Sequence, residues 1–143
     1  MELTSPAFDH GSAIPARYTC DGDNVSPGLT ITAIPEDASA LVLVMDDPDA
    51  PVGTWDHWIA YDFAPIATIR EDVGDLGTGG LNSWKEIGYG GPCPPSGTHR
   101  YFFRILALDT PVGLAEGAGK ADVLAASEGH VLAEAVLMGT FAG

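Results

Sequence analysis

Short apolar runs separated by turn residues recur along most of the chain. Residues 40–45 (ALVLVM) are apolar at every position, which is typical of a central strand covered on both faces. Residues 58–62 and 101–108 are two further runs, and residues 29–33 alternate between apolar and polar positions. Because glycine and proline separate these runs, the pattern predicts a mainly β fold with antiparallel strands.

A helical pattern is confined to the C-terminal part of the chain. Residues 120–126 (KADVLAA) combine good helix formers, and Asp122 near their start suits the positive end of the helix dipole. Gly129 then interrupts the pattern, and residues 131–142 allow apolar and polar positions to alternate. We therefore predict one short helix that ends at about residue 128, followed by a closing strand.

No repeat, low-complexity tract or linker divides the sequence. A length of 143 residues is usual for one domain with its own core, so we predict a single domain over residues 1–143. Residues 68–87 are rich in glycine and aspartate, and they predict a long surface excursion between strands.

The charge balance is strongly acidic, with six basic residues against twenty acidic ones and a net charge of −14. Such a field repels nucleic acid and anionic membranes, so we expect neither nucleic acid nor strong membrane binding. An acidic surface with few lysines suits a halophilic protein, although an ordinary acidic protein has the same composition. Residues 82–108 are the exception, since Lys85, Arg100 and Arg104 there face only Glu86. We therefore expect an anion to bind most favourably in this stretch.

The chain has no apolar run near the roughly 18–20 residues of a membrane span, and its first residues lack the basic and apolar regions of a secretory signal. We therefore expect a cytoplasmic location. Cys20 and Cys93 are the two cysteines, and a disulfide framework is not implied for a cytosolic chain. Both occur in turns, so the thiols could meet if these turns line one site; buried free thiols are the alternative.

Candidate chemistry first appears directly after the buried run at residues 40–45. In the segment DDPDAP, two prolines restrict the backbone and hold Asp47 and Asp49 with little freedom. These carboxylates could bond the backbone of their own turn, or they could join His57 in a polar network that raises the histidine pKa towards a cation at neutral pH. His57 could also be a half-buried core residue, since two tryptophans lie close to it in sequence.

A second candidate stretch combines a stiff loop with the start of a strand. Residues 88–98 contain prolines that stiffen the loop and glycines that let backbone amides approach a ligand. His99 and Tyr101 face one side of the following strand and can donate hydrogen bonds there, while Arg100 faces the other side. Arg100 is therefore expected to pair with Asp47 or Asp49. A rigid turn with a structural salt bridge is the alternative.

The segments DDPDAPVGTWDHW and GYGGPCPPSGTHRYFF, together with YTCDGDNVSP and GHVLAEAVLMGTF, resemble the phosphatidylethanolamine-binding protein family in its prokaryotic Raf-kinase-inhibitor-like branch. The resemblance implies a large central antiparallel sheet packed with a smaller sheet, and short peripheral helices. It also implies a small anion pocket for phosphate or phosphorylated ligands. The matching ligand-binding positions are Asp47, Asp49, Pro51, Trp55, His57, Pro94, Pro95, His99 and Tyr101.

The function expected from this resemblance is non-enzymatic binding or regulation, without a cofactor. A small phosphorylated or other anionic ligand is the expected partner, and a homodimer is possible. Inhibition of a kinase or protease, through the pocket or residues 68–87, is an alternative that the resemblance leaves open.

The same residue types would also allow two other classes of site. A serine hydrolase would use Ser96, an imidazole of His57 or His99, and Asp49, but the chain has no G-x-S-x-G motif. A metal centre would use His57, His99, Asp47 and Cys93, a spacing that matches no zinc pattern. The binding hypothesis requires that the two histidines, far apart in sequence, become neighbours in the fold.

Overall fold

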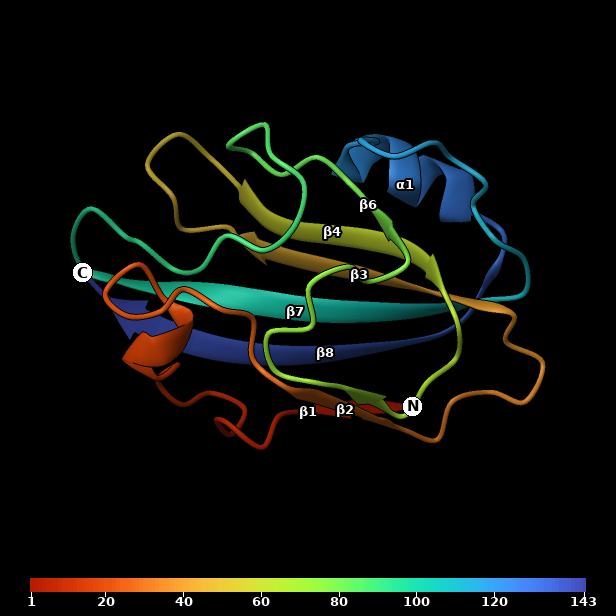
Figure 1. The fold of residues 1–143 in the computed structure, drawn as a ribbon, viewed down its shortest axis with the longest axis horizontal. Helices are drawn as coiled ribbons and strands as arrows, with labels where there is room; N and C mark the ends of the chain where they lie inside the picture. Colours follow the sequence, from red (N-terminus) through yellow and green to blue (C-terminus); the bar gives the residue numbers. More distant parts are fainter.

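The computed structural model describes residues 1–143 as two antiparallel sheets with one α-helix on the outer face of the larger sheet (Figure 1). The large sheet has the order β6 (Thr78–Gly79), β4 (Trp55–Phe63), β3 (Ala40–Asp47), β7 (Thr98–Leu108), β8 (Val131–Ala142). The small sheet has the order β1 (Glu2–Thr4), β2 (Leu29–Thr32), β5 (Thr68–Ile69), and the helices are η1 (Ala16–Tyr18) and α1 (Lys120–Ser127). The predicted fold class is thereby confirmed.

Strand β3 is buried at every position, as its apolar run predicted. Leu41, Leu43 and Met45 belong to the main core, which draws residues from both sheets. Val42 and Val44 face the other way into a smaller cluster that is closed by α1. Because side chains alternate across a strand, residues 40–45 must be apolar on both faces of the sheet. This buried strand in turn fixes the position of Asp47 at its end.

The predicted strands, helix and closing strand are all present, but three strands are longer than their apolar runs. Strand β3 continues to Asp47, β4 begins at Trp55, and β7 begins at Thr98. The extensions of β3 and β4 pair with each other, and the extension of β7 pairs with β8. Because strand pairing continues beyond the apolar runs, polar side chains lie at one end of the large sheet. The apolar pattern alone could not predict this.

The prediction of one long surface excursion at residues 68–87 is wrong in part. Strand β5 pairs with β2, and β6 pairs with β4, so this segment contributes an edge to each sheet. Ile69 and Leu76 are buried. Gly77 has a positive φ and lies so close to the Tyr61 backbone that a side chain would clash. Strands of two residues are too short to produce an alternating pattern.

None of the helices in this structure has the length and apolar character needed to span a membrane.

Candidate functional site

A cavity of about 300 Å³ lies at the end of the large sheet where β3 stops and β4 and β7 begin. The loops that precede β4 and β7 lie at this same end, on the left in Figure 1. Eight of the nine predicted site residues line the cavity: Asp47, Pro51, Trp55, His57, Pro94, Pro95, His99 and Tyr101. Asp49 does not line it. The two histidines therefore meet around one cavity, as the binding hypothesis required.

A β-bulge turns His57 towards this cavity. In the pairing of β3 with β4, Met45 lies opposite Trp58 and Asp46 lies opposite Asp56, so His57 is an extra residue without a partner across the ladder. A bulge of this kind locally redirects side chains. The His57 ring then packs edge-on against Tyr101, with ring centroids 5.3 Å apart.

His57 is a buried imidazole whose orientation is fixed by the backbone. Its Nδ1 lies 2.7 Å from the carbonyl oxygen of Gly90, so Nδ1 carries a hydrogen and donates it. Burial lowers the pKa of His57, and weaker interactions with the Gly90 carbonyl and the Asp47 carboxylate only partly oppose this. The prediction that a neighbouring carboxylate makes His57 a cation at neutral pH is therefore wrong. The neutral ring keeps Nε2 as an acceptor.

The carboxylate of Asp47 binds the other histidine instead. His99 Nδ1 donates to Asp47 Oδ2 over 2.7 Å, and both side chains are buried. The second oxygen, Oδ1, accepts the backbone N–H of Asp49 at 2.8 Å, as expected of an aspartate that opens a turn. Asp47 thus fixes both the ring of His99 and the loop after β3, and each of its oxygens already has a donor.

Asp49 forms a separate pair outside the cavity. Arg100 Nε and Nη2 donate to the two oxygens of Asp49, each at 2.9 Å, and the Arg100 backbone N–H donates at 3.0 Å. This guanidinium lowers the pKa of Asp49 to about 2. The predicted pairing of Arg100 is confirmed, with Asp49 as its partner. The pair ties the loop after β3 to the start of β7.

The positive charge expected around residues 82–108 does not reach the cavity. Arg100 is paired with Asp49, and Arg104 lies 3.6 Å from Glu134. No lysine or arginine lines the cavity. Any preference for an anion must therefore come from hydrogen-bond donors and from protonation of the imidazoles.

Two buried donors at the cavity have no hydrogen-bond partner in the protein. These are the hydroxyl of Tyr101 and Nε1 of Trp55. Burial, with a further contribution from the Asp47 carboxylate, raises the pKa of Tyr101, so the hydroxyl keeps its proton. Because an unpaired buried donor is costly, these two atoms are the strongest indication that a polar group binds here.

Sequence analysis missed Trp84, which also lines the cavity. Its ring packs edge-on against His57 at 4.9 Å and against Trp55 at 5.6 Å. Trp84 comes from the segment interpreted as a surface excursion, where Asn82 Oδ1 accepts its backbone N–H. A single tryptophan in a glycine-rich segment was the signal that could have identified it. Ala50 and Val52 also line the cavity and were missed as well, and Cys93 is the remaining lining residue.

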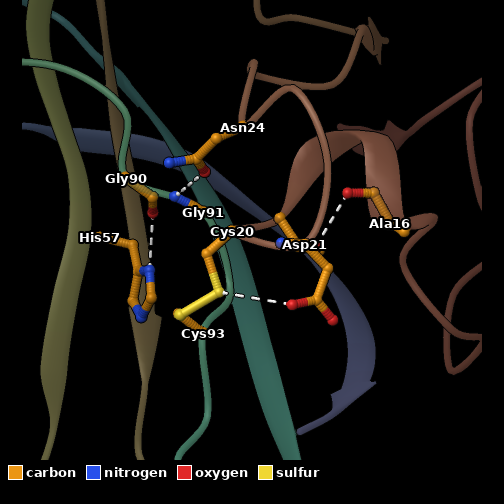
Figure 2. Close-up of a disulfide and its surroundings, with 9 residues drawn as sticks. Ala16, Cys20, Asp21, Asn24, His57, Gly90, Gly91 and Cys93 are labelled. Carbon is orange, nitrogen blue, oxygen red and sulfur yellow. Dashed lines mark hydrogen bonds between the residues drawn. A yellow bond between two sulfur atoms is a disulfide. The ribbon is translucent and has the colours of Figure 1, made fainter.

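Cys20 and Cys93 form a disulfide that joins the turn after η1 to the loop before β7. Figure 2 shows it beside the His57 ring. The interpretation of both cysteines as buried free thiols is therefore wrong, since both residues are exposed and bonded. The loop also packs closely here, because a side chain at Gly91 would clash with Asn24. The two cysteines are 73 positions apart in sequence, and spacing alone cannot show whether residues so far apart meet in the fold.

The residues named for a hydrolase or a metal centre are not arranged for those roles. Ser96 is exposed and does not line the cavity, so it cannot join either imidazole and Asp49 in a triad. Cys93 is bonded to Cys20, and the structure gathers no group of metal-ligating side chains.

A larger cavity of about 710 Å³ borders β4, β6 and Tyr89. Its ionisable side chains are Tyr89 and the carboxylates Asp72, Asp75 and Glu116, and no histidine lines it. The smaller cavity, with its unpaired donors, is therefore the better candidate site.

The sequence profile of the phosphatidylethanolamine-binding protein family matches residues 4–142. The chain belongs to this family. An UPF0098 protein of Methanothermobacter thermautotrophicus is 49% identical over 148 residues, which cover 99% of this chain and 98% of that protein.

Two solved structures of the family share the fold. A putative phosphatidylethanolamine-binding protein homologue of Chlamydia trachomatis, CT736, has a TM-score of 0.96 at 42% identity, covering 99% of this chain and 97% of the other. YbcL of Escherichia coli has a TM-score of 0.90 at 26% identity, covering 99% and 98%. The family resemblance noted in the sequence is thus confirmed over almost the whole chain.

Proposed function

We propose that this member of the phosphatidylethanolamine-binding protein family is a non-enzymatic binding protein whose 300 Å³ cavity takes phosphate or a phosphorylated group. The observation that carries the proposal is the pair of unpaired buried donors, Tyr101 Oη and Trp55 Nε1, beside two imidazoles. The oxygens of a phosphoryl group would accept from both donors and remove the cost of leaving them unpaired.

The hydrogen bonds of the two histidines support a ligand that carries both acceptors and a proton. Each imidazole uses Nδ1 within the protein, for Gly90 or for Asp47, which leaves Nε2 available. A neutral ring accepts a hydrogen bond at Nε2, and a protonated ring donates one. A hydrogen phosphate can meet either state, because it offers an O–H as well as charged oxygens.

The absence of lysine and arginine from the lining supports a small ligand bound with modest affinity. A simple ion pair does not hold it, and its charge is balanced by protonation of an imidazole. The carboxylate of Asp47 does not oppose this arrangement strongly, because both of its oxygens already accept hydrogen bonds.

The direct test is titration calorimetry with inorganic phosphate and with a phosphomonoester. Tyr101→Phe removes only the hydroxyl, and we expect it to weaken binding about tenfold, the value of one hydrogen bond to a charged group. Ser96→Ala is the matched control, because Ser96 loses an exposed hydroxyl that does not line the cavity. Equal affinity of the Tyr101→Phe variant and the parent would contradict the proposal.

Regulation of a kinase or protease, formation of a homodimer and a cytoplasmic location stay predictions of the sequence. The short strands within residues 68–87 leave less free loop for a protease than the sequence suggested.

A further inference from the structure

The disulfide lies at the rim of the cavity and is open to solvent. Cys93 lines the cavity, and both cysteines are exposed. In Figure 2 the bond lies between the His57 ring and the carboxylate of Asp21. Disulfides that dissolved thiols can reach are the ones that exchange readily. The position of this bond therefore combines chemical access with contact to the candidate site.

The part of the loop that precedes Cys93 is held by hydrogen bonds as well as by the disulfide. The Tyr89 hydroxyl donates to Tyr18 O at 2.7 Å, and the Gly91 N–H donates to Asn24 Oδ1 at 2.9 Å. The backbone N–H of Cys20 donates to the carbonyl of residue 92 at 3.1 Å. These contacts would keep residues 89–92 docked if the disulfide opened.

The part that follows Cys93 has much weaker support. Residues 93–96 make no backbone–backbone hydrogen bond, and Pro94 and Pro95 have no N–H to donate. The next such contact is the N–H of Gly143 to Gly97 O at 3.0 Å. Pro94 is buried and lies close to Gly143, so apart from this packing the disulfide is the link that fixes the Pro94–Pro95 wall of the cavity.

We propose that Cys20–Cys93 is a thiol–disulfide exchange site at which a low-molecular-weight thiol opens the bond and releases the Pro94–Pro95 wall of the cavity. This inference goes beyond the proposed function, because it concerns the loop and holds for any ligand.

The exchange proceeds in two displacements. A thiolate first attacks Sγ of Cys20 and forms a mixed disulfide; the Cys20–Cys93 bond breaks, and its electron pair leaves with Sγ of Cys93. A second thiolate then attacks the sulfur of the bound thiol and releases Cys20. Two thiols are thereby oxidised to one disulfide, and both protein sulfurs are reduced and take protons from water.

Asp21 distinguishes the two sulfurs as leaving groups. Its Oδ1 lies 4.0 Å from Sγ of Cys20, and a nearby carboxylate disfavours negative charge on that sulfur. Cys93 is therefore the better leaving group, and the first thiolate to form is the one at the cavity.

The first test is reduction of the folded parent by dithiothreitol, followed by backbone ¹⁵N relaxation in both redox states. We expect reduction without denaturant, and order parameters at Cys93, Ser96 and Gly97 that fall from about 0.85 to below about 0.6. Gly91 and the residues of β3 should keep rigid values. A bond that reacts only in denaturant, or mobility that spreads over the whole chain, would overturn the proposal.

The control is the double variant Cys20→Ser/Cys93→Ser, which should match the reduced parent and not respond to dithiothreitol. If this variant fails to fold, the reduced parent still supplies the comparison. Order parameters at these loop residues that are identical in the oxidised and reduced parent would also overturn the proposal.

A separate arm measures inorganic phosphate binding in both redox states, with about tenfold weaker binding expected after reduction because the wall is no longer preorganised. Equal binding in both states would overturn the link between the disulfide and the cavity. If phosphate binds neither state, the proposed function fails, whereas the relaxation experiment still decides whether the wall is released.

Discussion

The two walls of the cavity are built in different ways. One wall comes from β3, β4 and β7, where strand pairing places Asp47, His99 and Tyr101, and hydrogen bonds fix the rings of His57 and His99. The other wall is the loop at Pro94 and Pro95, which one disulfide anchors. The strand wall cannot move without disturbing the core, whereas the loop wall can. Chemistry that must be placed accurately lies on the first, and any control of access lies on the second.

The largest expected effect comes from removing the covalent anchor of the loop wall. The replacement of Cys20 and Cys93 by serine should lower the free energy of unfolding by about 4 kcal/mol, because a cross-link over a loop of this length restricts the unfolded chain strongly. Urea unfolding of the variant and the oxidised parent measures this difference. An unchanged midpoint would show that the disulfide does not stabilise the fold.

The next effect concerns the strand wall. Asp47→Ala should lower the free energy of unfolding by about 3 kcal/mol, because it leaves the buried His99 and the backbone N–H of Asp49 without their acceptor.

Asp49→Ala is the matched control for that change, because it removes a carboxylate from the same loop. Its pair with Arg100 is exposed, and exposed pairs contribute little, so we expect a much smaller loss. Urea unfolding compares the two variants, and equal losses would mean that burial does not distinguish the two pairs.

A third effect is the pH dependence of binding. Burial lowers the pKa of His57 in the free protein, and a bound anion would raise it, so binding takes up a proton. Affinity should therefore fall as pH rises above the pKa of the free protein, by up to about tenfold per pH unit for one proton. Calorimetry with sulfate isolates the histidine contribution, because sulfate does not titrate in this range.

His57→Gln should flatten this pH profile while retaining a polar side chain. A profile that keeps its slope in that variant would assign the proton to a different group.

The same lowered pKa also determines how His57 affects stability. Because the folded-state pKa lies below the unfolded value, the stability from burying the neutral ring is present above about pH 6.5. It is lost as pH falls towards and through the folded-state pKa. Unfolding curves of the parent should therefore show a loss on the acid side that is smaller in His57→Gln.

The smallest effect is expected from Trp84, which contacts the site through its ring edge and is 41% exposed. Trp84→Ala should weaken phosphate binding by about 1 kcal/mol, the usual value of such an aromatic contact, with little change in the unfolding midpoint. Trp84→Phe should restore most of the affinity. If Trp84→Ala binds phosphate as tightly as the parent, Trp84 does not contribute to the binding site.

Much of the fold could be predicted from sequence because it follows from local patterns. The apolar run in β3 requires cover on both faces, and the prolines around Asp47 and Asp49 require a turn. The alternation of His99, Arg100 and Tyr101 placed Arg100 outside and the other two side chains inside, as the structure shows. These are properties of consecutive residues, and backbone geometry alone converts them into structure.

Contacts between distant segments could not be predicted in this way. The bulge at His57 depends on the register of β4 against β3. The protonation state of His57 depends on its burial, and the choice of His99 as the partner of Asp47 depends on which strand lies next to β3.

The sequence by itself determined the longer strands, the turn chemistry, the acidic composition and the family. Tertiary structure alone decided that Trp84 joins the site, that Cys20 meets Cys93, and that Arg104 lies beside Glu134 instead of at the cavity. The physical reason is that local preferences act between neighbours in the chain, whereas burial, charge pairing and covalent cross-links depend on which surfaces the packed sheets bring together.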